Sequence, residues 1–310
     1  MPIFSFNLSD FVFVWWALLY EAIPFVVLGS LVSGVVARCV SREAVTRVLP
    51  RSRLLGIAAS AFLGLILPMC ECGIVPVIRR LVAKGVPVSC AVAYMLAAPI
   101  INPIVIGSTV LAFGGQNPAT VAGLRVGMAF VVATGLGILV WRLLGESNVL
   151  VRRDDGEHEH AAHDHHGHEG GVLGDTLRIA SDDFLEIGTF LVLGAAIAAF
   201  INSGFSRAAM EPFAQNPFAA VPSMMVLAIL LNLCSEADAF VAASFYAFPM
   251  AAKLAFLVLG PMVDMKLMAM YTTMFRPKAI VAIAGMVIVL VFLLCTTGYV
   301  WMPLVTPGGR

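Results

Sequence analysis

The sequence predicts an all-α, polytopic integral membrane protein made of two inverted repeats, each with about three transmembrane helices and a broken, re-entrant helical hairpin. Of its 310 residues, 60% are hydrophobic and 12% are charged, whereas a soluble domain has about 25% charged residues. Long apolar runs recur along the chain, each close to the roughly 20 residues that cross a bilayer. The third observation is an internal repeat, described below.

Six apolar segments are long enough to be transmembrane helices. They are residues 11–37, 86–113, 119–144, 182–204, 254–275 and 279–302. The first is too long for the core of a signal peptide, and neither a basic stretch before it nor a small-residue cleavage pattern after it is present. We therefore expect it to be retained as a helix.

Two further apolar stretches, 54–84 and 221–250, are each interrupted by polar or helix-breaking residues. The first is broken at Pro68–Gly73 and the second at Cys234–Asp238. A helix of about 14 residues reaches only about 21 Å, which is short of a hydrocarbon core of about 30 Å. Paired short segments of this kind are typical of re-entrant hairpins that line a cavity.

The distribution of Lys and Arg predicts that both termini lie outside the cell. With that orientation, most of the 19 basic residues fall on the cytoplasmic side, as the positive-inside rule requires. These residues are Arg38, Arg42, Arg47, Arg51, Arg53, Arg79, Arg80, Lys84, Arg142, Arg152, Arg153, Arg178, Arg276 and Lys278.

The only sizeable hydrophilic segment, 145–181, is predicted to be a cytoplasmic linker because its low hydrophobicity does not support a core. It holds all six histidines, mixed with acids: His158, His160, His163, His165, His166 and His168. Imidazole suits Zn(II), Ni(II) and Co(II). The tract is a weak candidate for gathering metal, and acquired low-complexity sequence is the alternative.

The two halves of the chain, 11–144 and 182–302, repeat a series of motifs in the same order. Glu21-x-x-x-Phe25-x-x-Leu28-Gly29 returns as Glu186-x-x-x-Phe190-x-x-Leu193-Gly194, and Cys70, Pro87, Pro99 and Asn102 correspond to Cys234, Pro249, Pro261 and Asp264. With the predicted topology, the hairpins enter from opposite sides, so the repeats are inverted. Inverted repeats with broken helices are typical of secondary transporters, whose solute site lies near the midplane.

The first break carries two thiols and a carboxylate: Cys70, Glu71 and Cys72. Thiolates favour soft ions such as Cu(I), Zn(II) or trivalent arsenic, and a carboxylate adds charge or accepts a proton. A carboxylate in an apolar stretch indicates function. The alternative is that cysteine is simply a small residue beside a turn.

The second break carries Cys234, Ser235, Glu236 and Asp238. Two acids at membrane depth are costly unless they face water or a ligand. In a shallower hairpin they would be ordinary solvated acids.

Further candidates lie outside the two breaks. Asn102 and Asp264 follow prolines that allow polar groups to turn inward, although Asn102 alone would more often join helices. Lys266, two residues on, is a candidate for partly neutralising Asp264, although direct pairing is not favoured because residues two apart do not share a helix face. Glu21 and Glu186 are candidates for a proton relay or for capping polar neighbours. Arg125 is expected to pair with an acid inside the bundle.

Several motifs resemble those of the UPF0718/DUF318 permeases, the family that includes ArsP-type organoarsenical exporters and YraQ-type predicted permeases. They are residues 67–77 (LPMCECGIVPV), 85–87 (GVP), 97–103 (AAPIINP), 233–240 (LCSEADAF) and 259–264 (LGPMVD). The resemblance spans about 11–302. It implies an inner-membrane permease of a prokaryote, exporting trivalent arsenicals in some relatives and linked to copper and zinc efflux in others. A solute-binding role for Cys70, Cys72 and Cys234 is implied in the same way.

Together these features predict a permease, not an enzyme, that exports a small thiophilic solute through a site at the two hairpin tips. One alternative is a divalent-cation transporter that uses mainly carboxylates. A membrane thiol redox protein and a structural subunit of a larger complex are alternatives of another class. No P-loop motif is present, and no cofactor or nucleic acid is expected. The predicted partners are the lipid bilayer, an inorganic ion or organometalloid, and either a second copy or a companion membrane subunit.

Overall fold

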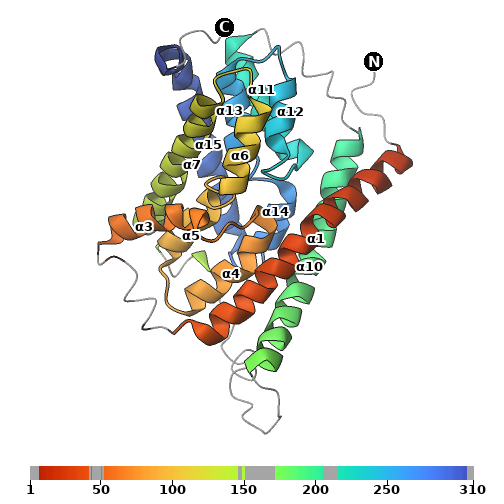
Figure 1. Ribbon diagram of the computed structural model, residues 1–310, viewed down its shortest axis with the longest axis vertical. Helices are drawn as coiled ribbons and strands as arrows, with labels where there is room; N and C mark the ends of the chain where they lie inside the picture. The colour runs from red at the N-terminus through yellow and green to blue at the C-terminus, as the bar shows by residue number, and fades with distance from the viewer. Residues whose placement is uncertain are drawn as a thin grey trace.

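The computed structural model describes residues 7–41, 43, 50, 52–145, 149–150, 172–204 and 216–305. Within these ranges the chain is helical, and the only β-type pairing is an isolated bridge between Leu150 and Phe275 (Figure 1). The all-α prediction is therefore confirmed. The histidine tract, and with it most of the predicted linker, lies outside the described residues.

Among the described residues, four helices are long and apolar enough to cross a membrane: α1 (Leu8–Cys39), α7 (Pro118–Leu139, extended by one π-helical turn, Val140–Leu144), α10 (Val172–Gly204) and α15 (Pro277–Val305). They match four of the six predicted spans. Asn7 caps α1 by accepting a hydrogen bond from the backbone N–H of Ser9. Pro118 starts α7, at a position where its missing N–H costs nothing.

Both predicted breaks are present. The first half has α3 (Arg53–Ala61), a 3-10 turn (Phe62–Leu65) and α4 (Glu71–Ala83), and the second has α11 (Pro217–Leu231) and α12 (Asp238–Ser244). In the first break, Pro68 has no N–H to donate, so the helix cannot continue through it. In the second, Asn232 has a left-handed backbone (φ 50°), a conformation that ends a helix.

The prediction of continuous helices over 86–113 and 254–275 is wrong. The first segment forms α5 (Val88–Ala97) and α6 (Pro103–Ala112), and the second forms α13 (Met250–Leu259) and α14 (Met265–Tyr271). The side chains of Asn102 and Asp264 cap α6 and α14, so each capping residue begins a new helix. A ten-residue helix is only about 15 Å long, and none of these four helices spans a bilayer alone.

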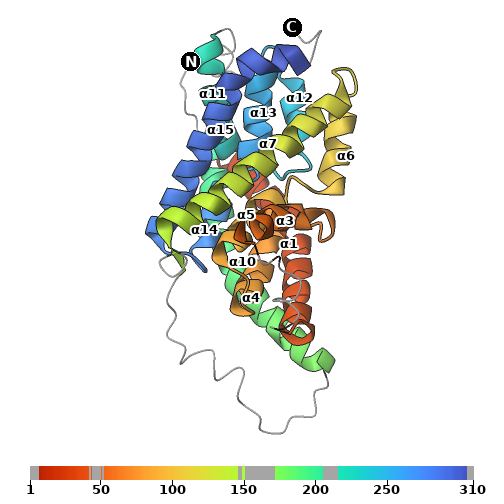
Figure 2. The ribbon, with the colours of Figure 1, turned by 90° about the vertical axis from the view of Figure 1, so that its left-hand side faces the viewer.

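Corresponding helices of the two halves make corresponding contacts. α3 packs on α5 as α11 packs on α13, α5 packs on α7 as α13 packs on α15, and α4 packs on α14 as α12 packs on α6. Figure 2 shows α7 and α15 running in opposite directions along the molecule. The two halves thus surround the breaks from opposite ends.

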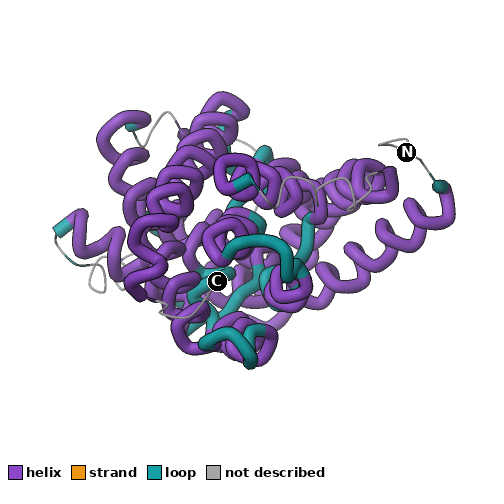
Figure 3. The backbone as a smooth tube through the Cα atoms, turned by 90° about the horizontal axis from the view of Figure 1, so that it is seen from above, coloured by secondary structure: helices purple, strands orange, loops and turns teal. Residues whose placement is uncertain are grey.

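The α1/α10 pair stands to one side of this arrangement, as Figure 3 shows for α1 in a view from above. α1 packs on α4, and α10 packs on α14. Both contacts depend on glycine. A Cβ at Gly29 would lie 2.1 Å from the carbonyl oxygen of Gly73, and a Cβ at Gly194 would lie 2.8 Å from the Cα of Lys266. The glycine that closes the repeated motif therefore has the same structural task in both halves.

Candidate functional site

The two breaks meet in the interior of the bundle. Glu71 is the first residue of α4, and Ser235 lies in the second break. The Ser235 hydroxyl donates a hydrogen bond to Oε2 of Glu71 over 3.3 Å, and both side chains are buried. The two breaks are therefore in direct contact through this pair.

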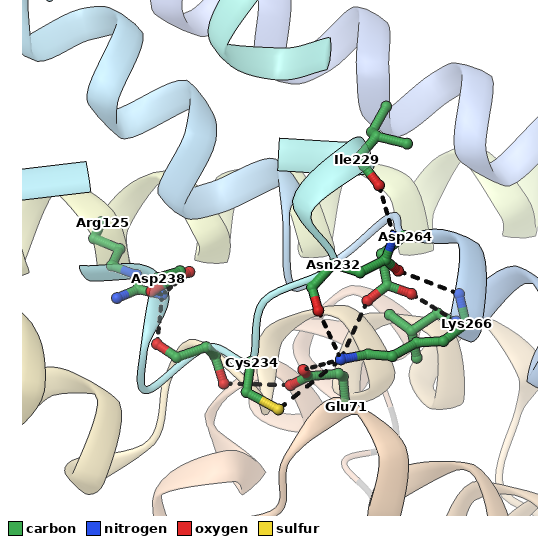
Figure 4. Close-up of polar contacts among 10 residues, drawn as sticks. Glu71, Arg125, Ile229, Asn232, Cys234, Asp238, Asp264 and Lys266 are labelled. Atoms are coloured by element: carbon green, nitrogen blue, oxygen red, sulfur yellow. Dashed lines mark hydrogen bonds and ion pairs between the residues drawn. The ribbon is translucent and has the colours of Figure 1, made fainter. Parts of the chain in front are cut away.

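Lys266, near the start of α14, lies at the centre of the site (Figure 4). Its Nζ is 3.3 Å from Glu71 Oε1 and 3.6 Å from Asp264 Oδ2. The same ammonium donates to the backbone carbonyl of Asn232 over 3.4 Å and lies 3.9 Å from Cys234 Sγ. One buried cation thus contacts α4, the second break and the cap of α14.

The ion pair between Asp264 and Lys266 corrects the expectation that these residues do not pair. Asp264 is the N-cap of α14 and has an extended backbone (φ −137°, ψ 169°), so helix-face spacing does not apply to it. Its Oδ1 accepts from the backbone N–H of Leu267 over 2.6 Å. Its Oδ2 is buried with no hydrogen-bond partner and faces the ammonium beyond hydrogen-bonding distance.

Arg125 of α7 forms a second buried ion pair, as expected, and its acid is Asp238. The Arg125 NH2 group is 2.9 Å and 2.8 Å from the two carboxylate oxygens, and it also donates to the backbone carbonyl of Ser235 over 3.1 Å. Its NH1 group donates to Thr109 Oγ1 of α6 over 2.7 Å. Ser235 therefore joins the Arg125 pair to the Lys266 pair.

The charges along this buried chain alternate in sign: Asp264, Lys266, Glu71, Arg125 and Asp238. An isolated charge in a medium of low dielectric constant is very costly, and removing one partner of a buried pair leaves that cost uncompensated. The alternation keeps each acid beside a cation. Such a network positions the tips of both broken helices relative to each other.

Three cysteines surround the network. Cys70, Cys72 and Cys234 are all buried free thiols. Cys70 is the N-cap of α4, Cys72 lies in the first turn of that helix, and Cys234 Sγ is 3.9 Å from the Lys266 ammonium. In the described part of the chain, no three His, Cys, Asp or Glu side chains are grouped as ligands for one metal ion. Joint metal binding by the three thiols stays a prediction.

The other predicted residues lie around this centre or away from it. Glu236 is partly buried in the second break, and Asn102 caps α6 through a hydrogen bond from Ile104 N. Glu186 pairs with Arg79 of α4 over 2.5 Å, and Glu21 is partly buried on α1. The six loop histidines lie outside the described residues.

Two residues at the centre were not predicted as site residues. Lys266 was considered only as a neighbour of Asp264, although a lysine inside an apolar segment is itself a signal of function. Asn232 orients the second break, because its Nδ2 donates to Ile229 O over 2.9 Å while its own carbonyl faces Lys266. Only its position directly before the Leu-Cys pair pointed to it.

The family profile and the similar proteins that were found all indicate the same family. The sequence profile of the family described as "Predicted permease" (ArsP_1) matches residues 7–301. The chain is 39% identical over 276 residues to UPF0718 protein YcgR of Bacillus subtilis (strain 168), which covers 89% of this chain and 92% of that protein. It is also 34% identical over 280 residues to a Streptococcus mutans serotype c protein named "Putative two-component membrane permease complex subunit", covering 90% and 91% of the two chains.

No solved structure matches the chain. The profile covers nearly the whole sequence, and both relatives align over about nine tenths of their length. The four long apolar helices agree with a multi-pass membrane protein. The chain belongs to the ArsP_1 (UPF0718) family of membrane permeases.

Proposed function

We propose that this permease exports a small thiophilic solute, either a soft metal ion or a trivalent organoarsenical, through the site where the two broken helices meet. The single observation that carries the proposal is the pair of buried free thiols, Cys70 and Cys72, two residues apart at the start of α4 and beside the Glu71–Lys266 ion pair. Two adjacent thiols hold a soft ion much better than they hold a hard one.

The chemistry of a dithiol fits both solutes. With a trivalent organoarsenical that carries two hydroxyl groups, each As–O bond is replaced by an As–S bond, and each thiol proton leaves with a hydroxyl group as water. With a monovalent soft cation, the thiol protons are lost and the two thiolates bind the ion. Cys234 supplies a third thiol from the opposite break, next to the Lys266 ammonium.

The carboxylate-based alternative has less support. Glu71 and Asp264 face Lys266, and Asp238 is held by Arg125. A divalent cation at these acids would first have to displace a buried cationic side chain. A thiol redox protein would need Cys234 to pair with Cys70 or Cys72, because Cys70 and Cys72 are too close in sequence for an unstrained disulfide.

We further propose that both hairpins are re-entrant in a cell or inner membrane, with both termini outside and the histidine tract in the cytoplasm. This orientation is supported by Arg38, Arg79, Arg80, Lys84 and Arg178, which lie on the ends of α1, α4 and α10 away from the start of α1 (Figure 1). The S. mutans relative is named as a complex subunit, so we include a companion chain beside a second copy among the partners.

The test is uptake into everted membrane vesicles of Cu(I), Zn(II), trivalent methyl- and phenylarsenicals, for the wild type, Cys70→Ser and Cys72→Ser. Cys295→Ser is the matched control, because Cys295 is a buried thiol on α15 outside the site. We expect uptake of a soft solute that falls at least tenfold in both site variants and stays unchanged in the control. Equal uptake by all four proteins would overturn the dithiol site. A fifth protein, Glu71→Gln, tests the carboxylate alternative: loss of uptake in this variant alone would favour that alternative.

A further inference from the structure

The α1/α10 pair breaks the symmetry that the other helices obey. α4 corresponds to α12, and α14 corresponds to α6, and these four helices make equivalent contacts. In the described residues the pair packs mainly on α4 and α14, with a smaller contact on α11, and neither of its helices packs to a comparable extent on α6 or α12. Large apolar side chains on those two helices and in the turn after α12 are exposed: Ile104, Leu111, Phe240 and Tyr246.

We propose that this α6/α12 face is the docking surface for the α1/α10 pair of the same chain in a second transport state. The proposal rests on the permease function but not on the identity of the solute. In a protein with two equivalent halves, the contacts available to one half are also available to the other. Exchange of the two sets of contacts is then a direct way to expose a central site alternately to the two sides.

Repeat equivalence specifies the contacts of the second state. Gly29 now approaches Gly73 of α4, so its counterpart Gly194 would approach Ala237, the residue that corresponds to Gly73. Gly194 now approaches Lys266 of α14, so Gly29 would approach Ile104, which is 58% exposed. Both glycines would thus dock at suitable residues: Gly194 at Ala237, which is small, and Gly29 at Ile104, whose side chain is exposed.

α1 and α10 are joined along their length and can move as one body. The indole N–H of Trp15 donates to Val192 O over 3.3 Å toward one end of the pair. Gly34 lies against Thr176, where a Cβ would come within 2.6 Å of the backbone oxygen, and Arg38 pairs with Asp175 at the other end. These contacts lie within the pair and are unaffected by its position on the bundle.

Ion pairs hold the pair on α4 in the present state. Arg79 pairs with Glu186 over 2.5 Å, and Arg80 pairs with Asp183 over 2.9 Å. On the opposite face the residues that correspond to Arg79 and Arg80 are Ala243 and Ser244, which carry no charge. These two ion pairs therefore have no counterparts on the α6/α12 face, and weakening them should shift the population toward the second state.

The experiment measures the position of the pair by disulfide formation in native membranes, in a Cys39→Ser background because Cys39 is the exposed one of the six cysteines. The present state is reported by Ser33→Cys with Pro76→Cys, whose Ser33 Oγ and Pro76 O are 3.3 Å apart. The second state is reported by the symmetry-related pair Ala198→Cys with Phe240→Cys. Each pair is tested alone, with Glu186→Gln, and with Asp175→Asn, the matched control inside the moving body.

We expect Glu186→Gln to raise the intramolecular Ala198–Phe240 crosslink at least threefold and to lower the Ser33–Pro76 crosslink, whereas Asp175→Asn changes neither. Absence of the Ala198–Phe240 product while the Ser33–Pro76 product forms would overturn the proposal. So would a product between two chains, which would show that a second copy occupies the face. Because neither readout requires transport, failure of the thiophilic-solute proposal leaves this test intact.

Discussion

Glu71 and Ser235 are hydrogen-bonded partners that occupy equivalent positions in the two halves of the chain. Each directly follows the cysteine that marks its break, Cys70 or Cys234, and the Ser235 hydroxyl lies 3.3 Å from Glu71 Oε2. Two equivalent positions can touch only near the axis that relates the halves. The axis therefore passes through the site, and one carboxylate there faces one hydroxyl. Because the position equivalent to Glu71 is a serine, these two positions together present one carboxylate to Lys266, that of Glu71.

Lys266→Met is expected to destabilise the protein severely. The substitution keeps an unbranched side chain only one atom shorter than lysine, but it leaves Glu71 and Asp264 buried without the Lys266 cation. Breaking a buried ion pair by removal of one partner costs roughly 3–5 kcal/mol. Thermal stability in detergent, followed by the fraction of monodisperse protein after heating, should fall sharply relative to the wild type.

The control for this substitution is Lys253→Met, which removes the other buried lysine of the C-terminal half. Lys253 lies over the rings of Phe113 and Tyr246, about 6.0 Å from each ring centre. Loss of a cation–π contact costs roughly 0.5–2 kcal/mol, so this variant should lose less stability than Lys266→Met. Equal losses of stability in the two variants would show that the ion pairs of Lys266 stabilise the protein no more than the cation–π contacts of Lys253 do.

Gly29→Ala and Gly194→Ala are expected to reduce the yield of folded protein strongly. A Cβ at either position would overlap backbone atoms of α4 or α14, which cannot move aside as a flexible side chain can. Gly188→Ala and Gly285→Ala are the matched controls, because a Cβ at these helical positions meets nothing within 4 Å. Expression followed by size-exclusion chromatography compares the four variants. Normal behaviour of Gly29→Ala would contradict the close approach of α1 to α4.

The sequence allowed much of this architecture to be predicted because its signals are local. Apolar length identified α1, α7, α10 and α15, and the Pro68 and Cys234–Asp238 interruptions located both breaks. The repeat identified the equivalence of Asn102 and Asp264, and both are N-caps. The same caps were the missed signal for breaks in 86–113 and 254–275, because hydrophobicity alone does not distinguish one long helix from two short ones.

The pairing of charges was less predictable, since it depends on the packing of helices far apart in sequence. Arg125 was expected to meet an acid, but nothing local selects Asp238 over Glu236 or Glu71. Direct pairing of Asp264 with Lys266 was not favoured, because both residues were taken to lie within one helix. Its extended backbone as an N-cap reverses that conclusion. Capping geometry therefore decides which helix-spacing rules apply.

Thiol accessibility provides a prediction about the resting state of the site. Cys39 is exposed, whereas the other five cysteines are buried: Cys70, Cys72, Cys90, Cys234 and Cys295. N-ethylmaleimide should therefore modify Cys39 at least tenfold faster than any of these five in the native protein, and all six should react after denaturation in SDS. Peptide mass spectrometry measures each position. Rapid modification of Cys72 in the native protein would show that the dithiol is open to solvent in the resting state.

The Arg125–Asp238 pair allows a stricter test of buried charge, because both partners can be removed. Arg125→Met leaves Asp238 buried without its cation and should cost roughly 3–5 kcal/mol, whereas the double variant Arg125→Met/Asp238→Leu removes both charges and should recover much of that loss. A double-mutant cycle on apparent melting temperature separates the pair from its neighbours. Recovery will be incomplete, because the double variant also removes the hydrogen bonds from Arg125 to Thr109 and to the Ser235 carbonyl. A double variant less stable than Arg125→Met alone would mean that Asp238 stabilises the second break by itself.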